Sequence, residues 1–191
     1  MRAFLALTLP LEVRRALTDA QEALRAADAD VAWVRPEQLH LTLKFLGEVT
    51  DAQREAIDEG MRRVAAAHRG FTTQARALGT FPPGRAPRIV WAGVDDSGGA
   101  VSRLAETSET RAEAAGVPRE ARGFLPHVTV GRVRSARGTQ ELVRRLTDLA
   151  WPGTPSWDVR QVTLFQSLLD ARGAQYRVVA EYPLAGMEQA A

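Results

Sequence analysis

The chain carries one short pattern twice, and this repeat limits the folds that are open to it. His40-Leu41-Thr42-Leu43 and His127-Val128-Thr129-Val130 each place a histidine and a threonine two residues apart in an apolar, β-prone run. Because side chains alternate between the two faces of a strand, the histidine and threonine of each segment share a face. The opposite face of the first segment is expected to enter the core with these side chains: Leu39, Leu41, Leu43 and Phe45.

The elements around the two segments recur in the same order. Apolar periodicity predicts a strand, a helix and the histidine strand at 2–9, 11–28 and 39–47, and again at 88–94, 98–115 and 126–134. Each half then adds a helix and a strand, at 51–68 and 71–80 and at 139–149 and 157–168, and a turn at 170–173 leads to a last strand at 175–182. Thr50 and Gln53 form a capping-box pattern at the start of the helix at 51–68.

This repeated order predicts an α+β fold. We expect residues 1–191 to form a single bilobal domain, with two pseudo-symmetric lobes of mostly antiparallel sheet and the helices outside. A pseudo-two-fold axis would bring the two histidine–threonine faces together across a central cleft between the lobes.

The composition excludes several classes of protein. With 45% hydrophobic and 25% charged residues, the 191-residue chain has the make-up of an ordinary soluble globular protein. The absence of cysteine excludes disulfides, thiolate zinc sites and cysteine nucleophiles. No stretch approaches the roughly 20 apolar residues that span a bilayer, and the first apolar run is too short for a signal peptide. We expect a soluble, cytoplasmic protein that is monomeric and has no membrane partner.

Histidine chemistry is the main functional signal. The chain has three histidines, and two of them open the repeated segments. Histidine titrates near neutral pH, so two imidazoles on one cleft can supply a general base and a general acid. The third, His68, ends an apolar helical stripe and is expected to be structural. The i, i+4 spacing of helical zinc ligands is absent, so we expect neither a metal nor another cofactor.

The two segments in their context resemble the motifs of a known superfamily. The runs His40-Leu41-Thr42-Leu43-Lys44-Phe45-Leu46-Gly47-Glu48-Val49 and Pro126-His127-Val128-Thr129-Val130-Gly131-Arg132 are similar to the two motifs of the 2H phosphoesterases. Within that superfamily, nearly the whole chain is similar to the RNA 2′,3′-cyclic phosphodiesterases, also called 2′-5′ RNA ligases. The second motif ends in Val130 where leucine or isoleucine is commoner, a difference that strand packing tolerates.

The resemblance implies a metal-independent reaction in which water opens a 2′,3′-cyclic phosphate to a 2′-phosphate. It implies that His40 protonates the leaving ribose oxygen and that His127 activates the water. Thr42 and Thr129 are expected to donate hydrogen bonds to the non-bridging phosphate oxygens. The expected partner is RNA with a 2′,3′-cyclic phosphate end, or a small cyclic nucleotide.

Three further residues are candidate substrate contacts. Lys44, the sole lysine among 25 basic residues, has the strand parity of His40, so we expect it on the site face where it can meet an anion. Arg132 has the opposite parity to His127, so a regular strand would direct this candidate RNA-backbone contact away unless a bulge intervenes. Phe81 offers an aromatic surface on which a base can stack, although such residues more often serve loop packing.

Two other functions stay open. The same site could join RNA halves through a 2′-5′ linkage, which is nearly the reverse of ring opening. A non-catalytic RNA-end binder is the alternative from another class, because a group of arginines that suits phosphate surrounds the second segment: Arg119, Arg122, Arg132, Arg134 and Arg137. Pure binding does not need two titrating groups, which favours the enzyme.

Overall fold

The computed structural model describes residues 1–170 and 173–187. Over these residues, one eight-stranded sheet has the order β10-β9-β1-β3-β7-β6-β5, with β2 also on β7, and β4 pairs with β8 in a small second sheet. The strands are β1 (Arg2–Thr8), β2 (Val31–Trp33), β3 (His40–Glu48), β4 (Phe71–Thr73), β5 (Ala75–Phe81), β6 (Ile89–Val94), β7 (His127–Val133), β8 (Trp157–Val159), β9 (Gln161–Asp170) and β10 (Gly173–Pro183). The helices are α1 (Leu11–Arg25), α2 (Asp51–Ala67), α3 (Ala100–Ala114), α4 (Thr139–Asp148) and the short 3₁₀ turn η1 (Pro36–Gln38).

The predicted α+β class with mostly antiparallel strands is confirmed, and the predicted helices form where the apolar periodicity placed them. In α1, the residues at helical spacing are buried against the sheet, among them Val13, Leu17 and Leu24. The capping box at Thr50 and Gln53 is also confirmed, because each side chain bonds the backbone N–H of the other residue. The predicted turn at 170–173 includes residues 171–172, which lie outside the described residues.

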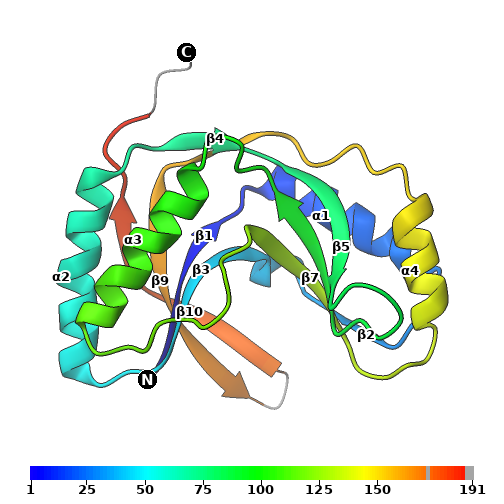
Figure 1. Cartoon of the computed structure of the whole chain (residues 1–191), viewed down its shortest axis with the longest axis horizontal. Helices are drawn as coiled ribbons and strands as arrows, with labels where there is room; N and C mark the ends of the chain where they lie inside the picture. Colours follow the sequence, from blue (N-terminus) through cyan, green and yellow to red (C-terminus); the bar gives the residue numbers. More distant parts are fainter. Residues whose placement is uncertain (171–172, 188–191) are drawn as a thin grey trace.

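The sheet has a pseudo-two-fold arrangement. Strands β9-β1-β3 form one lobe and β5-β6-β7 the other, with β3 and β7 in the middle. Helices α2 and α3 cover the first lobe, and α1 and α4 cover the second, so the helices lie on the outside (Figure 1). The small β4–β8 sheet joins equivalent strands of the two halves.

The lobes do not coincide with the two halves of the sequence. Strand β5, from the first half, pairs with β6 of the second lobe, and β9, from the second half, pairs with β1 of the first. The single strands predicted at 71–80 and 157–168 are therefore wrong. Each is two strands, because the chain leaves the β4–β8 sheet at Gln74 or Arg160 and then joins the opposite lobe.

A β-bulge interrupts each histidine strand at the same motif position. Lys44 pairs with Leu5 but Thr42 pairs with Ala6, so Leu43 is an extra residue in β3. In β7, Gly131 pairs with Val90 and Thr129 with Trp91, which leaves Val130 extra. An extra residue reverses the faces of the residues that follow it. In β3 this applies to Lys44 and Phe45, because Leu46 is a second extra residue.

The bulges make the predicted faces of Phe45 and Lys44 wrong, and they place Arg132 on the face that it can reach only beyond a bulge. Phe45 was expected in the core, but its side chain is 58% exposed. Lys44 was expected on the site face, but it is 3% exposed on the side covered by helices. Arg132 is exposed and shares the face of His127 and Thr129, as a bulge requires.

Lys44 forms a buried ion pair with α3. Its Nζ donates to Glu109 Oε1 at 2.6 Å and to the carbonyl oxygen of Pro118 at 2.7 Å. The same Glu109 oxygen accepts the backbone N–H of Glu120 at 2.9 Å. This cluster therefore ties the first histidine strand to the segment that leads into the second.

We predict that Lys44→Met lowers the free energy of unfolding by about 3–5 kcal/mol, because it leaves the Glu109 carboxylate buried without its partner. Arg119→Met is the matched control, since it removes two solvent-exposed ion pairs to the same helix, with Glu106 and Glu113, and should cost much less stability than Lys44→Met. Urea denaturation of both variants measures the difference. Equal losses of unfolding free energy in the two variants would show that the buried Lys44–Glu109 pair stabilises the fold no more than the exposed pairs do.

Candidate active site

The two imidazoles of the repeated segments are held in the same way. Nδ1 of His40 lies 2.7 Å from the carbonyl oxygen of Gln38, and Nδ1 of His127 lies 2.7 Å from that of Leu125. In the neutral ring, Nδ1–H donates to this carbonyl, which leaves the Nε2 lone pair free. Among the described residues, neither Nε2 atom has a hydrogen-bond partner. Both rings can therefore exchange a proton with a bound molecule through Nε2.

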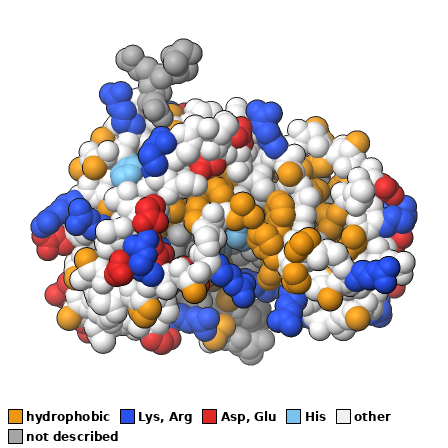
Figure 2. Space-filling model, in the orientation of Figure 1, with side chains coloured by type: hydrophobic (Ala, Val, Ile, Leu, Met, Phe, Trp, Pro, Cys, Tyr) orange, Lys and Arg blue, Asp and Glu red, His pale blue; other side chains and the backbone are white. Residues whose placement is uncertain are grey.

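The two histidine strands meet at the centre of the motifs. Leu41 of β3 pairs with Val128 of β7, and the two strands are antiparallel to each other. For the residues on either side of this pair, the register places His40 opposite Thr129 and Thr42 opposite His127. The four predicted catalytic residues thus share one face, and Figure 2 shows a histidine in a hollow near the middle of the molecule, bordered by hydrophobic side chains.

His40 lies in an environment that disfavours its positive charge. Burial of the ring is the largest effect that lowers the pKa of His40 below its ordinary value of 6.5. The nearby positive charges of Arg132 and His127 lower it further, whereas the hydrogen bond to Gln38 raises it. His40 is therefore mostly neutral at pH 7. The effect on His40 also indicates that His127 and Arg132 lie near its ring.

Aromatic rings surround His40. Its ring centroid lies 4.8 Å from Phe4 and 5.2 Å from Tyr176, which meets it edge-on, and Phe165 follows at 6.4 Å. None of these three residues was predicted from the sequence to be a site residue. The signal that could have found Phe165 is the pseudo-symmetry, because Phe165 pairs with Phe4 as Phe81 pairs with Ile89.

Phe81 lies beside the second histidine. Its ring meets that of His127 edge-on at 5.1 Å and rests at 5.1 Å from the indole of Trp91. That indole lies flat across Gly79 and Gly93, where a side chain would collide with it. The structure thus brings Phe81 to the site, and its stacking against a base stays a prediction.

Arg132 completes the charged part of the site. Its guanidinium makes no ion pair with any other residue in 1–170 or 173–187, and it faces the same side as the histidines. A free guanidinium is well suited to bind phosphate. Lys44 cannot do the same, because Glu109 and Pro118 hold its ammonium group on the opposite face.

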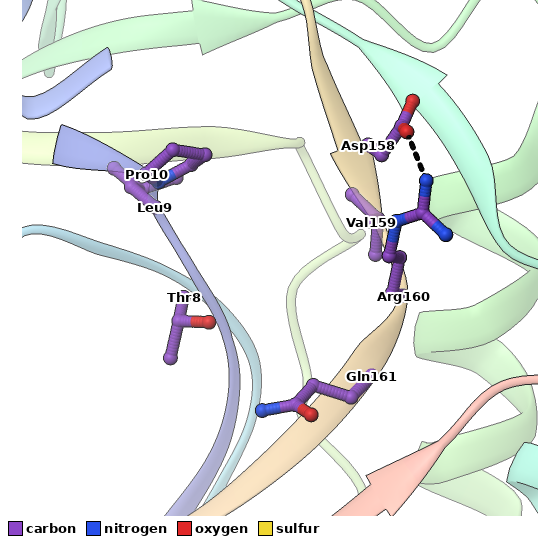
Figure 3. Close-up of a pocket in the computed structure, with 7 residues that line it drawn as sticks. All are labelled: Thr8, Leu9, Pro10, Asp158, Val159, Arg160 and Gln161. Atoms are coloured by element: carbon purple, nitrogen blue, oxygen red, sulfur yellow. Dashed lines mark hydrogen bonds and ion pairs between the residues drawn. The ribbon is translucent and has the colours of Figure 1, made fainter. Parts of the chain in front are cut away.

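A separate hollow of about 240 Å³ adjoins the site (Figure 3). It is lined by Thr8, Leu9, Pro10, Asp158, Val159, Arg160 and Gln161. Thr8 pairs with His40 across the sheet, but the hollow contains none of the predicted site residues. Its Arg160 is already paired with Asp158 at 2.7 Å, as the dashed line in Figure 3 marks.

Two other features follow from the described part of the chain. No group of three or more His, Asp or Glu side chains within it is placed to hold a metal ion. None of its helices is both long and apolar enough to cross a membrane.

We predict that Arg132→Met raises the pKa of His40, because it removes a positive charge that destabilises the imidazolium ion. Burial remains, so the pKa moves toward its ordinary value without passing it. Titration of the His40 ring protons by NMR measures the shift, and Arg134→Met, two residues along the chain, is the control. An unchanged His40 midpoint in Arg132→Met would place Arg132 away from the ring.

Comparison with known proteins identifies the family. A family model described as LigT-like phosphoesterase matches residues 7–91 and 93–176, and each matched segment contains one of the histidine motifs. Among curated proteins, the chain is 34% identical over 176 residues to an RNA 2′,3′-cyclic phosphodiesterase of Methanothermobacter thermautotrophicus, which covers 92% of this chain and 95% of that protein. It is 31% identical over 157 residues to a protein of the same name from Aquifex aeolicus, which covers 81% of this chain and 82% of that protein.

Solved structures share the fold. The crystal structure of TT0787 of Thermus thermophilus matches with a TM-score of 0.81 and 30% identity, over 98% of this chain and all of that one. E. coli LigT complexed with 3′-AMP matches with a TM-score of 0.77 and 27% identity, over 96% of this chain and 97% of that one. The matched segments hold both motifs, and the relatives span almost the whole chain. The chain therefore belongs to the LigT-like phosphoesterase family.

Proposed function

We propose that this protein is an RNA 2′,3′-cyclic phosphodiesterase that hydrolyses a terminal 2′,3′-cyclic phosphate to a 2′-phosphomonoester. The observation that carries the proposal is the matched pair of imidazoles, each with Nδ1 bonded to a carbonyl and Nε2 free, on strands that meet at Leu41 and Val128. The curated relatives bear the name of this activity. RNA with a cyclic phosphate end or a small cyclic nucleotide is the proposed substrate, and we propose that the protein acts as a cytoplasmic monomer.

The two histidines divide the proton transfers. His127 takes a proton from water as the water oxygen bonds to phosphorus, and His40 gives a proton to the 3′-oxygen as its bond to phosphorus breaks. His40 must be protonated for this step, although its surroundings lower its pKa. The anionic cyclic phosphate supplies a negative charge beside the ring, which offsets the charge of Arg132 and favours the imidazolium ion of His40. Substrate binding thus prepares the acid.

Neutral and charged donors stabilise the negative charge that develops on phosphorus. The register sets each threonine across from the histidine of the other motif, so Thr42 and Thr129 can both donate to the non-bridging oxygens. Arg132 adds a positive charge on the same face. E. coli LigT has been solved in complex with 3′-AMP, and this supports a ligand of nucleotide size for the present protein.

We predict that His40→Ala and His127→Ala each lower kcat on a cyclic-phosphate-ended oligonucleotide by about 10²–10⁴-fold, measured in EDTA. Each variant lacks one of the two proton-transfer groups. His68→Ala is the control, because that ring bonds Val64 and Thr107 on the helical side of the first lobe. Full turnover in either of the first two variants would contradict the mechanism.

We also predict that Thr42→Val and Thr129→Val each remove about 2–4 kcal/mol of transition-state stabilisation, since valine keeps the shape but lacks the hydroxyl donor. The measurement is kcat/KM for the same oligonucleotide. Thr72→Val, at an exposed strand position on β4, should leave kcat/KM unchanged. If both motif variants matched Thr72→Val, the threonines would be no more than strand residues.

The two alternatives give different products. A 2′-5′ ligase would join a 5′-hydroxyl RNA to the cyclic-phosphate end, and linkage analysis of the product detects this reaction. Bulk water competes with the hydroxyl, so hydrolysis is expected to dominate. A non-catalytic RNA-end binder would release no product, and its affinity would be indifferent to His40→Ala and His127→Ala.

A further inference from the structure

An apolar row crosses the first lobe on the side of the histidines. Cross-strand pairing aligns Val178 of β10 with Phe165 of β9, Phe165 with Phe4 of β1, and Phe4 with Phe45 of β3. The two ends of the row are open to solvent, with Val178 51% exposed and Phe45 58% exposed, whereas Phe4 between them is buried. Val178 and Phe45 can therefore contact a ligand on this face of the sheet.

The row is continuous with the catalytic histidine. The ring of Phe4 lies 4.8 Å from that of His40 and 6.2 Å from that of Phe45. A series of neighbouring aromatic rings therefore connects the imidazole to the exposed ring of Phe45. The bulge at Leu43 causes this exposure, because it turns Phe45 onto the face of His40 and Thr42 while Lys44 and Leu46 remain buried.

The pseudo-symmetry of the sheet relates Phe45 to Arg132. Phe45 pairs with Phe4 just beyond the first bulge, and Arg132 pairs with Ile89 just beyond the second. The two positions are equivalent, yet one carries an exposed aromatic ring and the other an unpaired guanidinium. The position just beyond the bulge is therefore aromatic in the first lobe and cationic in the second.

A nucleotide has two groups that suit these two residues: a flat aromatic base at one end and an anionic phosphate at the other. We propose that Phe45 is the platform on which the base of the substrate's terminal nucleotide stacks, while its cyclic phosphate lies between the two histidines on the side of Arg132. This inference rests on the proposed function and names the residue that selects nucleotides over other cyclic phosphates. Stacking is tolerant of base identity because every base has a π face.

The test compares two substrates that differ only in the base: adenosine 2′,3′-cyclic phosphate and the 2,3-cyclic phosphate of methyl riboside. We expect Phe45→Ala to lower kcat/KM for the adenosine substrate by roughly 5- to 150-fold, mainly through KM, and to leave the base-free substrate unchanged. Phe45→Trp should restore the preference. Leu11→Ala is the matched control, because Leu11 is 52% exposed at the start of α1, on a helix that covers the other lobe.

The assignment would be overturned if Phe45→Ala left the ratio of kcat/KM between the two substrates unchanged, whether both values stayed at the wild-type level or both fell equally. A change in sedimentation without a change in that ratio would instead assign the ring to contact with a second copy of the chain.

A binding measurement separates this inference from the proposed function. Calorimetric titration with adenosine 2′-monophosphate and with methyl riboside 2-phosphate needs no turnover. If the wild-type protein hydrolysed neither cyclic phosphate, the proposed function would fail. The stacking platform would still stand if adenosine 2′-monophosphate bound more tightly than the riboside phosphate and Phe45→Ala removed the difference, and it would fall if the two bound equally.

Discussion

A single antiparallel contact at the middle of the sheet determines the geometry of the site. Leu41 and Val128, the second residues of the two motifs, pair where the two lobes meet. Because a pair in an antiparallel ladder fixes its neighbours, this contact sets each histidine across from the threonine of the other motif. The carbonyls of Gln38 and Leu125 then orient the two rings alike. The symmetry of the fold thus produces a symmetric set of proton donors and acceptors.

The bulges give this symmetric frame different chemistry on its two sides. Gly131 in the second lobe is equivalent to Lys44 in the first, because each directly follows the bulge. There, Val31 and Trp33 of β2 press against the backbone and leave no room for a side chain. One position further, Phe45 and Arg132 project onto the site face. The position beyond the bulge is thus aromatic in one lobe and cationic in the other, whereas the histidines and threonines are the same in both.

Much of the site could be predicted from the sequence, because alternation along a strand is a strong local rule. It placed His40 with Thr42 and His127 with Thr129, and the helical periodicity of residues such as Val13 and Leu17 located the helices. The bulges could not be predicted, since Leu43 and Val130 are ordinary apolar strand residues and only the partner strand shows which of them is extra. Lys44 and Phe45 were consequently assigned to the wrong faces. The exchange of β5 and β9 between the lobes and the three-residue strand β2 likewise depend on tertiary pairing, which local patterns do not contain.

The central claim is that both imidazoles act on one phosphorus atom. A crystal structure of the protein with adenosine 2′-monophosphate tests it most directly. The account predicts that the Nε2 atoms of His40 and His127 both lie within hydrogen-bonding distance of oxygens on the same phosphoryl group. A phosphoryl group bound by one imidazole alone, or held in the hollow lined by Thr8 and Arg160, would contradict it.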